Sequence, residues 1–389
     1  MAACTNNVEL GFVEKSPPWR LLSQFFPSKV GGKPAWLNLK EVPKSQNLVC
    51  PNCNKTMTFL LQIYCPPPPG MPGDEDDATA EATGQSSCFH RTLYVFCCRE
   101  ATCHQTSNSE DQKSPFAIFR CQLERRNDFY SYEPPDEDSQ IPEKDIISPK
   151  QFDVLLCDVC GCNAGNRKCG KCQKAVYCCK DHQVMDWKMG HKAKCGKEFG
   201  LHDATPPANN KFLFPEFELV TEPESEEYAA QEAEENIEKG SSNEDLRLVG
   251  AGLVQTAVEL ENGYMSTKDL DRMARKETDD DVQFMNFKKR ISHDPDQVLR
   301  YQKGGRPLFV SANDQPSEKD IMPCSCGAKR QFEFQIMPQL LTHLEVDSLD
   351  ASIDWGTLLI YTCSESCTEG PPYHPEFLWK QDYHNSSIS

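Results

Sequence analysis

Cysteine and histidine recur at metal-ligand spacing between residues 157 and 195. The spacing forms four pairs: Cys157-x2-Cys160, Cys169-x2-Cys172, Cys178-x3-His182 and His191-x3-Cys195. Two ligands separated by two or three residues can bind one ion, because a knuckle turn or one helical turn directs both side chains the same way. The four pairs therefore predict two tetrahedral zinc sites. Cys162 and Cys179 interrupt the pairing, and we interpret them as spare thiols.

A disulfide framework or a set of buried structural thiols is the alternative interpretation. The first residues, MAACTNNVELGF, contain no basic region followed by a long apolar run, so no secretory signal peptide is expected. Without an oxidising compartment, 21 cysteines favour zinc over cystine. No apolar run of about 18 residues exists, so no membrane span is expected. We therefore expect a cytoplasmic and nuclear location.

The composition limits the partners that this chain can bind. Its 389 residues suggest two or three domains, and its formal charge is −18, from 59 acidic against 41 basic residues. Such a chain does not bind nucleic acid through its overall field and suits a basic partner better, although solubility alone also explains acidity. Acidic residues concentrate in 73–81, 132–145 and 216–239. The last stretch lacks a continuous apolar face, so we expect it to be largely disordered, with a polar helix as the alternative.

The two ends of the chain repeat one pattern. Residues 29–36 (KVGGKPAW) resemble residues 302–309 (QKGGRPLF), and a cysteine pair and an alternating apolar run follow each segment. Gly304 follows Gly31 by 273 residues, and the cysteine pairs keep nearly the same offset. The runs TLYVFC and LLIYTC and the exits FAIFR and EFLWK also keep their order. Five motifs in one order favour two copies of a β-rich unit over chance similarity.

Each copy carries a second cysteine pair after its second strand. The ends of the two strands of a hairpin meet, so both pairs would converge on one zinc ribbon. The predicted ligands are Cys50, Cys53, Cys98 and Cys103 in the first copy, and Cys324, Cys326, Cys363 and Cys367 in the second. Buried free thiols are the competing interpretation, because one residue between Cys324 and Cys326 makes a cramped knuckle. Cys97 or His90 could also replace a ligand.

The economical architecture is a β-rich (α+β) fold in which two related β units form one split domain. A double-zinc finger and acidic disordered linkers are inserted between them, and two separate terminal domains are the alternative. The expected boundaries are 1–130 for the first β repeat, 131–150 for an acidic linker, 151–200 for the finger, 201–280 for an acidic, largely disordered linker and 281–389 for the second repeat. Phe284, Phe287 and Ile291 have helical spacing, which predicts an amphipathic helix packing on the domain, with a partner-binding helix as the alternative.

Residues 157–195 resemble the MYND zinc finger. The likeness lies in the two CxxC pairs, in Tyr177-Cys178 and Asp186-Trp187, and in the final histidine–cysteine pair. The resemblance implies interleaved ligands: Cys157, Cys160, Cys178 and His182 for one zinc, and Cys169, Cys172, His191 and Cys195 for the other. Both sites would be fully coordinated and therefore structural. Zinc binding would supply the free energy that folds so small a unit.

The chain as a whole resembles the programmed cell death protein 2 family, in its branch with a MYND finger. The resemblance rests on residues 26–37 (FPSKVGGKPAWL), 96–99 (FCCR), 332–341 (FEFQIMPQLL) and 354–356 (DWG). It implies a zinc-binding adaptor that acts as a dedicated chaperone for a newly made, basic ribosomal protein of the small subunit in 40S ribosome biogenesis. It also implies downstream roles in growth, stem-cell maintenance and apoptosis.

Other classes of function are open alternatives. MYND fingers also occur in lysine methyltransferases, but this sequence has no glycine-rich cofactor loop after a strand and no GxxxxGK[ST] motif, so we expect no catalysis. A transcription or chromatin cofactor is the main alternative, because MYND fingers resemble modules that bind proline-containing peptides. For the chaperone, an exposed sheet edge could capture an extended client segment by strand addition.

Overall fold

A computed structural model describes residues 8–67, 88–105, 113–165, 167–196, 210–225, 279–346 and 352–383. The tetraproline at 66–69 also predicts a flexible excursion to about residue 85. Most of this excursion and most of the acidic linker at 201–280 lie outside the described residues. Within these described ranges, no helix has the length and apolar character needed to cross a membrane.

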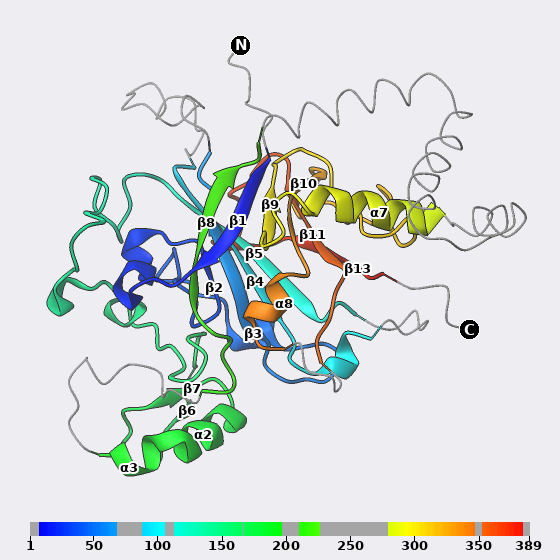
Figure 1. Cartoon of the computed structure of the whole chain (residues 1–389). Helices are drawn as coiled ribbons and strands as arrows, with labels where there is room; N and C mark the ends of the chain where they lie inside the picture. Colours follow the sequence, from blue (N-terminus) through cyan, green and yellow to red (C-terminus); the bar gives the residue numbers. More distant parts are fainter. Residues whose placement is uncertain are drawn as a thin grey trace, which may run out of the picture.

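One eleven-stranded sheet contains the strands of both copies (Figure 1). Its strand order is β12-β5-β4-β3-β2-β8-β1-β9-β10-β11-β13. The first copy contributes β2 (Lys29–Val30), β3 (Thr58–Tyr64), β4 (His90–Cys97) and β5 (Phe116–Leu123). The second contributes β9 (Leu299–Tyr301), β10 (Arg330–Ile336), β11 (Thr357–Cys363) and β13 (Phe377–Gln381). The prediction of a β-rich split domain with an inserted finger is confirmed.

The two copies agree in local detail. The β3–β4 ladder has a bulge at Leu60, and the β10–β11 ladder has a bulge at Glu333, 273 residues later. Gly31 and Gly304 have φ angles of 65° and 75°, a region that glycine enters without a Cβ clash. The repeat in the sequence is therefore a structural duplication, in which bulges and turns recur at the same positions.

Two further strands, β1 (Glu9–Glu14) and β8 (Phe217–Pro223), pair antiparallel at the centre of the sheet (Figure 1). Each strand precedes its own copy in the sequence but pairs with the other copy. β1 bonds to β9 of the second copy, and β8 bonds to β2 of the first. The copies have exchanged their first strands, which ties the two halves into one domain.

The strand β8 corrects the expectation of disorder at the start of the acidic stretch 216–239, and residues 226–239 lie outside the described residues. Glu218 separates Phe217 from Leu219, and Leu219 is buried in the main core. Glu216 forms an ion pair with the buried Lys29 of β2. The high glutamate content of this segment favoured a prediction of disorder. The pattern of individual residues, and not the average composition, decides whether a strand forms.

Residues 131–150 are also ordered, which corrects the expectation of a disordered linker. Short 3-10 turns form at η5 (Glu143–Asp145) and η6 (Pro149–Phe152). Gln24 donates a hydrogen bond to the carbonyl oxygen of Asp145 (3.0 Å) and accepts one from the amide of Ile147 (2.9 Å). These side-chain bonds to the backbone fix a segment that its charge alone marks as flexible.

The two edges of the sheet approach each other and form a near-barrel. At one edge β12 (Tyr373–Pro375) pairs with β5, and at the other β13 pairs with β11. Only Glu376 separates β12 from β13 along the chain. Its buried carboxylate accepts hydrogen bonds from Nε of Arg120 (2.7 Å) and Nε of Arg330 (2.9 Å), which belong to different copies. The closure leaves few unpaired edges.

Two large apolar clusters lie on the two faces of the sheet. The first fills the near-barrel with residues such as Leu93, Val95 and Ile360. The second lies outside the first copy and continues from Phe96 of β4 into the finger. Every residue of β4 is buried, because the interior core covers one face and the cluster that contains Trp36 and Tyr373 covers the other.

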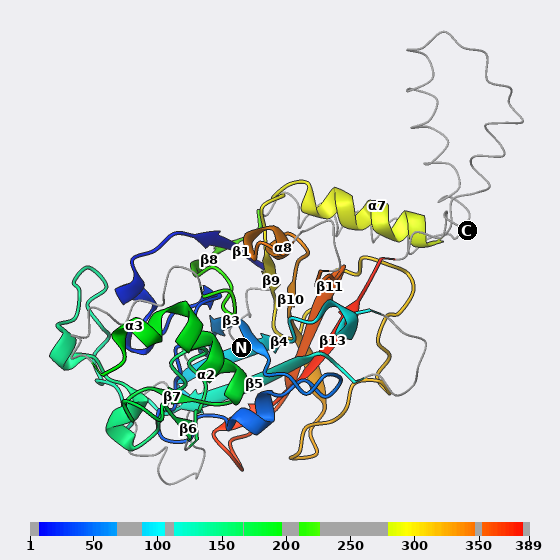
Figure 2. The ribbon, with the colours of Figure 1, turned by 90° about the horizontal axis from the view of Figure 1, so that it is seen from below.

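The helix α7 (Asp279–Ile291) packs against the second copy. Phe284, Phe287 and Ile291 form a small apolar cluster with Val310 and Met337, and Phe287 is buried. The prediction of an amphipathic helix packing on the domain is confirmed. Figure 2 shows that α7 and the finger lie on opposite sides of the molecule.

Candidate metal centres

The finger supplies its candidate ligands from knuckle turns and short helices. It consists of β6 (Arg167–Lys168), β7 (Val176–Tyr177), α2 (Lys180–Asp186), the short helical turn η7 (Trp187–His191) and α3 (Lys192–Lys194). Cys178 directly follows β7, and His182 lies in the first turn of α2. The last pair, His191 and Cys195, brackets α3. In each of the two groups, a CxxC turn therefore supplies two ligands, and a pair at a helix supplies the other two.

Each of the two groups in the finger brings four donor atoms to within 4.8 Å of one another. The groups are Cys157, Cys160, Cys178 and His182, and Cys169, Cys172, His191 and Cys195. In the first, the sulfurs of Cys160 and Cys178 are 3.7 Å apart; in the second, those of Cys169 and Cys195 are 3.8 Å apart. A tetrahedral zinc with bonds of about 2.3 Å to sulfur separates two sulfurs by about 3.8 Å. The donor sets therefore fit zinc.

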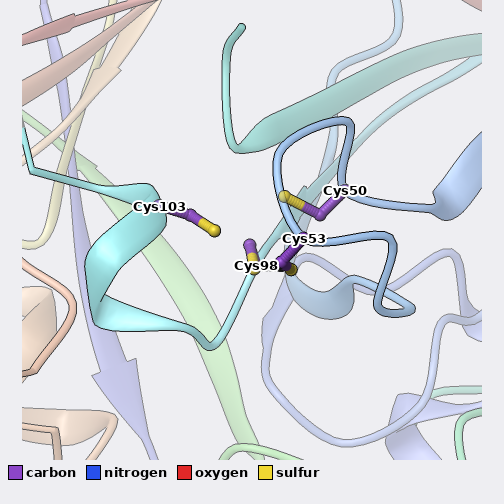
Figure 3. Close-up of side chains that lie close together, drawn as sticks. All are labelled: Cys50, Cys53, Cys98 and Cys103. Carbon is purple, nitrogen blue, oxygen red and sulfur yellow. Dashed lines mark hydrogen bonds between the residues drawn. The ribbon is translucent and has the colours of Figure 1, made fainter. Parts of the chain in front are cut away.

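The two β repeats bring together the same kind of group. Cys50, Cys53, Cys98 and Cys103 form one, and Cys324, Cys326, Cys363 and Cys367 form the other. Figure 3 shows the first: Cys50 and Cys53 lie on one loop and point toward Cys98 and Cys103 of the segment after β4. The sulfurs of Cys53 and Cys98 are 3.5 Å apart, and those of Cys326 and Cys363 are 3.7 Å apart. All twenty described cysteines are free, so no disulfide competes for these sulfurs.

All four groups begin with the same backbone turn. The residue after the second cysteine has a left-handed conformation, and its amide donates a hydrogen bond to the carbonyl oxygen of the first cysteine. These residues are Asn54, Gly161, Gln173 and Gly327, with φ of 59°, 71°, 56° and 87° and bonds of 2.9, 2.8, 2.9 and 2.9 Å. The short knuckle between Cys324 and Cys326 closes one residue earlier, at a glycine. Its cramped spacing therefore still builds the common turn.

In two of the knuckles, backbone amides favour the thiolate form of the first cysteine. Burial acts to raise the pKa of Cys169, but hydrogen bonds from the amides of Cys172 and Lys171 lower this pKa to about 6. Burial likewise opposes the hydrogen bond from the amide of Cys326, which lowers the pKa of Cys324 to about 7. The thiolate is the form that binds a metal ion, so the turns prepare both cysteines for zinc.

Second-layer contacts orient some of the donors. Nε2 of His191 lies 3.6 Å from the sulfur of Cys172, and its Nδ1 lies 3.9 Å from Oδ2 of Asp186. Tyr177 donates a hydrogen bond of 2.6 Å to the same carboxylate oxygen. In the second copy, the buried Arg120 donates to the carbonyl oxygen of Cys367 (2.9 Å) and lies 3.5 Å from its sulfur. Such partners fix a ligand's orientation and balance thiolate charge.

The two spare thiols of the finger lie beside the groups and not in them. The sulfur of Cys162 contacts the carbonyl oxygen of Cys160 at 3.8 Å. Cys179 is the N-cap of α2, and its sulfur accepts a hydrogen bond of 3.4 Å from the amide of His182. Neither belongs to one of the four groups.

The alternative ligands considered for the first repeat lie elsewhere. Cys97 is fully buried inside the near-barrel, and burial raises the pKa of its thiol to about 12. His90 stacks on Phe26, with ring centroids 4.2 Å apart, and shares a hydrogen bond of 3.0 Å with the hydroxyl of Tyr64. Adjacent strand residues point to opposite faces, so Cys97 and Cys98 cannot replace one another.

The finger docks on the first copy through contacts that the sequence did not reveal. Nε1 of Trp36 donates to the carbonyl oxygen of Gly161 (2.8 Å), and Nζ of Lys33 donates to that of Asp158 (2.7 Å). A Cβ on Gly161 would lie 2.8 Å from Cβ of Lys33, so only glycine fits this approach. The sequence signal that could have indicated this contact is a large aromatic residue, Trp36, close to the Gly-Gly turn.

The exchanged strands carry an acidic strip that the sequence also left unassigned. β1 and β8 contain Glu9, Glu14, Glu218 and Glu222 and no basic residue, and strand alternation places the last three of these on one face, where they form the strip. Glu14 lies directly opposite Glu218, an arrangement of like charges that destabilises a sheet. Among the described residues, no ion pair neutralises these four side chains.

The exchanged strands also leave part of their backbone paired on one side only. β2 pairs with only the first two residues of β8, and β9 pairs with only the first three of β1. Residues 221–223 of β8 and 12–14 of β1 therefore have one strand neighbour in the described structure. Residues 221–223 are also exposed.

A duplicated, strand-exchanged β domain with an inserted cysteine–histidine finger places this chain in the class of zinc-finger proteins. Its sequence matches the programmed cell death protein 2 N-terminal domain over residues 7–137, the C-terminal putative domain of the same protein over residues 281–382, and the MYND finger over residues 157–195. The MYND finger implies zinc binding and indicates interaction with other proteins.

Relatives extend this likeness over nearly the whole chain. Programmed cell death protein 2 of Mus musculus is 43% identical over 381 residues, which cover 98% of each chain. Programmed cell death protein 2-like of Mus musculus is 27% identical over 363 residues, covering 87% of this chain and 85% of the relative. Probable 20S rRNA accumulation protein 4 of Schizosaccharomyces pombe is 35% identical over 104 residues, covering 24% and 25%. No solved structure shows a significant match. The chain belongs to the programmed cell death protein 2 family.

Proposed function

We propose that this chain is a non-enzymatic zinc-binding adaptor that chaperones a newly made, basic ribosomal protein of the small subunit during ribosome biogenesis. The observation that carries the proposal is the acidic strip, in which Glu14 lies opposite Glu218 and no cation of the described residues forms an ion pair with either of them. The fission-yeast relative is named for 20S rRNA accumulation, which supports a link to ribosome production. Growth, stem-cell and apoptosis effects would follow from ribosome supply.

Capture would take place at the seam between the two copies. A client strand laid beside residues 221–223 would gain backbone hydrogen bonds, and its lysine or arginine side chains would offset the opposed glutamates. The net charge of −18 would also raise the rate of encounter with a basic protein. Exposed charge pairs contribute only about 0.2–1 kcal/mol each, so charge would mainly select the client and speed its association.

Zinc would hold the framework that presents this seam. We propose one structural zinc in each of the four groups, two in the finger and one in each β repeat. Each group has four protein donors, so no position is open for a substrate or a catalytic water. We further propose that the protein acts in the cytoplasm and the nucleus.

Replacing three acids of the strip tests the client site. We would express Glu14→Gln, Glu218→Gln and Glu222→Gln together and recover newly made ribosomal proteins during translation. We expect capture to fall about tenfold, because the charge pairs and the steering are lost together. The matched control replaces the exposed Glu41, Glu133 and Glu369 by glutamine, with the same change in net charge. Recovery of no ribosomal protein by the native chain, or equal capture by both variants, would reject the proposal.

A second role for the finger is the alternative proposal. Val184 on α2 is 41% exposed, whereas other apolar residues of the finger pack in the cluster that it shares with the first copy. An exposed aliphatic side chain on a MYND finger favours binding of a proline-containing peptide, as in a transcription or chromatin cofactor. If Val184→Asp abolished peptide binding while client capture persisted, the two roles would be separate.

A further inference from the structure

The finger is a basic unit in an acidic chain. Residues 157–196 contain eight basic and three acidic residues, whereas the whole chain has a formal charge of −18. With one zinc ion in each group of the finger, two ions and six thiolates together add only two negative charges. The finger therefore keeps a net positive charge.

Three of the basic residues lie around the second metal group of the finger. Lys168, Lys171 and Lys192 are each the immediate chain neighbour of one of its ligands. Adjacent Cα atoms are about 3.8 Å apart, and the donor atoms of the group lie within 4.8 Å of one another. The three lysines are therefore close together, and we call them the lysine rim. No ligand of the first group has a basic neighbour, and Cys157 and His182 adjoin aspartates instead.

The lysine rim lies at the end of the finger that points away from the sheet. Within the described residues, the hydrogen bonds between the finger and the first copy involve Asp158, Gly161 and Asn163, all close to the turn of the first group. Figure 1 shows α3, which begins at Lys192, at the outer end of the finger. All three lysines of the rim are exposed, and none forms an ion pair in the described part of the chain. Three positive charges therefore gather on one exposed surface.

We propose that the lysine rim binds the phosphate backbone of a nucleic acid strand. A lysine ammonium attracts phosphate as a point charge from many directions, whereas recognition of a carboxylate favours the planar fork of arginine. The finger contains seven lysines and one arginine between residues 157 and 196. This composition favours a phosphate backbone over an acidic peptide. Contacts to phosphate carry no information about base sequence, so the binding is independent of sequence and depends strongly on salt.

The acidity of the whole chain limits this binding but does not prevent it. The overall charge of −18 repels a polyanion at long range. Salt screens charges beyond about 8 Å at physiological ionic strength, so acids elsewhere in the chain oppose the rim less than their number suggests. The rim shares no residue with the acidic strip of β1 and β8. The inference is therefore independent of the proposed capture of a client protein.

Fluorescence anisotropy of a fluorescein-labelled oligouridylate, titrated with the full-length, zinc-loaded chain over a range of salt concentrations, tests the rim. We expect saturable binding at low salt. Replacing the three lysines of the rim by glutamine should weaken it at least about tenfold and lower the slope of log affinity against log salt by about 2. The control replaces the exposed Lys15, Lys113 and Lys319 by glutamine, with the same change in net charge, and should bind like the native chain.

Two further measurements separate lost charge from lost structure. Replacing the three lysines of the rim by arginine keeps the charge and should keep the binding. An oligothymidylate of equal length should bind with similar affinity, because contacts to phosphate do not read the 2′-hydroxyl group.

Three results would overturn the inference. The first is the absence of saturable binding by the native chain, and the second is equal binding by the native chain and the glutamine variant of the rim. The third is displacement of the oligouridylate by polyglutamate at an equal or lower concentration of charge, which would assign the rim to an acidic protein segment instead of a nucleic acid.

Discussion

Gln62 of β3 and Gln335 of β10 clamp the same backbone position in the two copies. Gln62 accepts a hydrogen bond from the amide of Ala35 (2.9 Å) and donates one to its carbonyl oxygen (3.2 Å). Gln335 makes the same two bonds to Leu308, at 2.7 and 3.0 Å. Both glutamines are 1% exposed, so each satisfies backbone groups that water cannot reach. The clamp joins the segment after each Gly-Gly turn to the sheet.

Replacing Gln335 by methionine should lower the free energy of unfolding by about 1–3 kcal/mol, because the partly buried amide and carbonyl of Leu308 lose their partners. Gln62→Met should cost a similar amount. Urea unfolding measures both. The half-exposed Gln331 of the same strand is the matched control, and Gln331→Met should stay within about 0.5 kcal/mol. Equal losses at 331 and 335 would contradict the clamp.

A second prediction concerns the docking of the finger. Gly161 and Gly165 both have positive φ, 71° and 61°, so alanine at either position strains the backbone by about 1 kcal/mol. Only at Gly161 would the new Cβ press on Lys33; at Gly165 nothing lies within 4 Å. Gly161→Ala should therefore cost about 1–3 kcal/mol more and speed amide exchange in residues 157–195. Indistinguishable effects of the two substitutions would mean that the finger does not rest on Lys33.

A third prediction concerns pH. Burial, with a smaller contribution from Arg125, lowers the pKa of His90 to about 4, so the folded chain keeps this histidine neutral. The unfolded chain binds a proton below about pH 6.5. Stability from His90 is therefore complete above that pH and is lost as the pH falls toward 4.

The variant His90→Phe keeps the stacking on Phe26 and removes this titration. Between about pH 7.5 and 5.5, the native chain should lose about 1 kcal/mol more unfolding free energy than the variant. Comparing the two proteins cancels the acid sensitivity of the zinc ligands. Parallel stability curves would show that His90 is not held neutral in the folded chain.

A fourth prediction concerns the metal group of the second copy. Cys363→Ser should remove one zinc ion per chain, because three remaining donors hold the ion weakly, and should lower the melting temperature. Cys88 is half-buried and outside all four groups, so Cys88→Ser should keep the native zinc content. Inductively coupled plasma mass spectrometry of the purified variants gives the ratio. A native zinc content in Cys363→Ser would exclude that group as a metal site.

Local spacing was enough to anticipate the hairpins and the clustering of their cysteines. Cys50 and Cys53 precede one strand and Cys98 follows its neighbour, so pairing of the two strands necessarily brings them together. The offset of 273 residues between Gly31 and Gly304 then indicated that a second copy has the same arrangement. These inferences needed only contacts within one hairpin, whose geometry depends on nearby residues.

The exchange of β1 and β8 could not be anticipated in the same way. Pairing of Gly11 with Thr221 joins residues that are far apart in the sequence, and nothing in either short strand names its partner. The contact of Trp36 with Gly161 and the closure through Glu376 are equally non-local. Register and partner choice depend on which buried surfaces fit together, and a single sequence does not display that fit.

Native mass spectrometry of the intact chain counts the zinc ions that hold this duplicated framework. Four groups of donors predict four ions per chain, released in two classes because two lie in the finger and one in each β repeat. A count of two, with the Cys363→Ser variant also retaining two, would confine zinc to the finger. That result would contradict the assignment of a zinc ribbon to each copy.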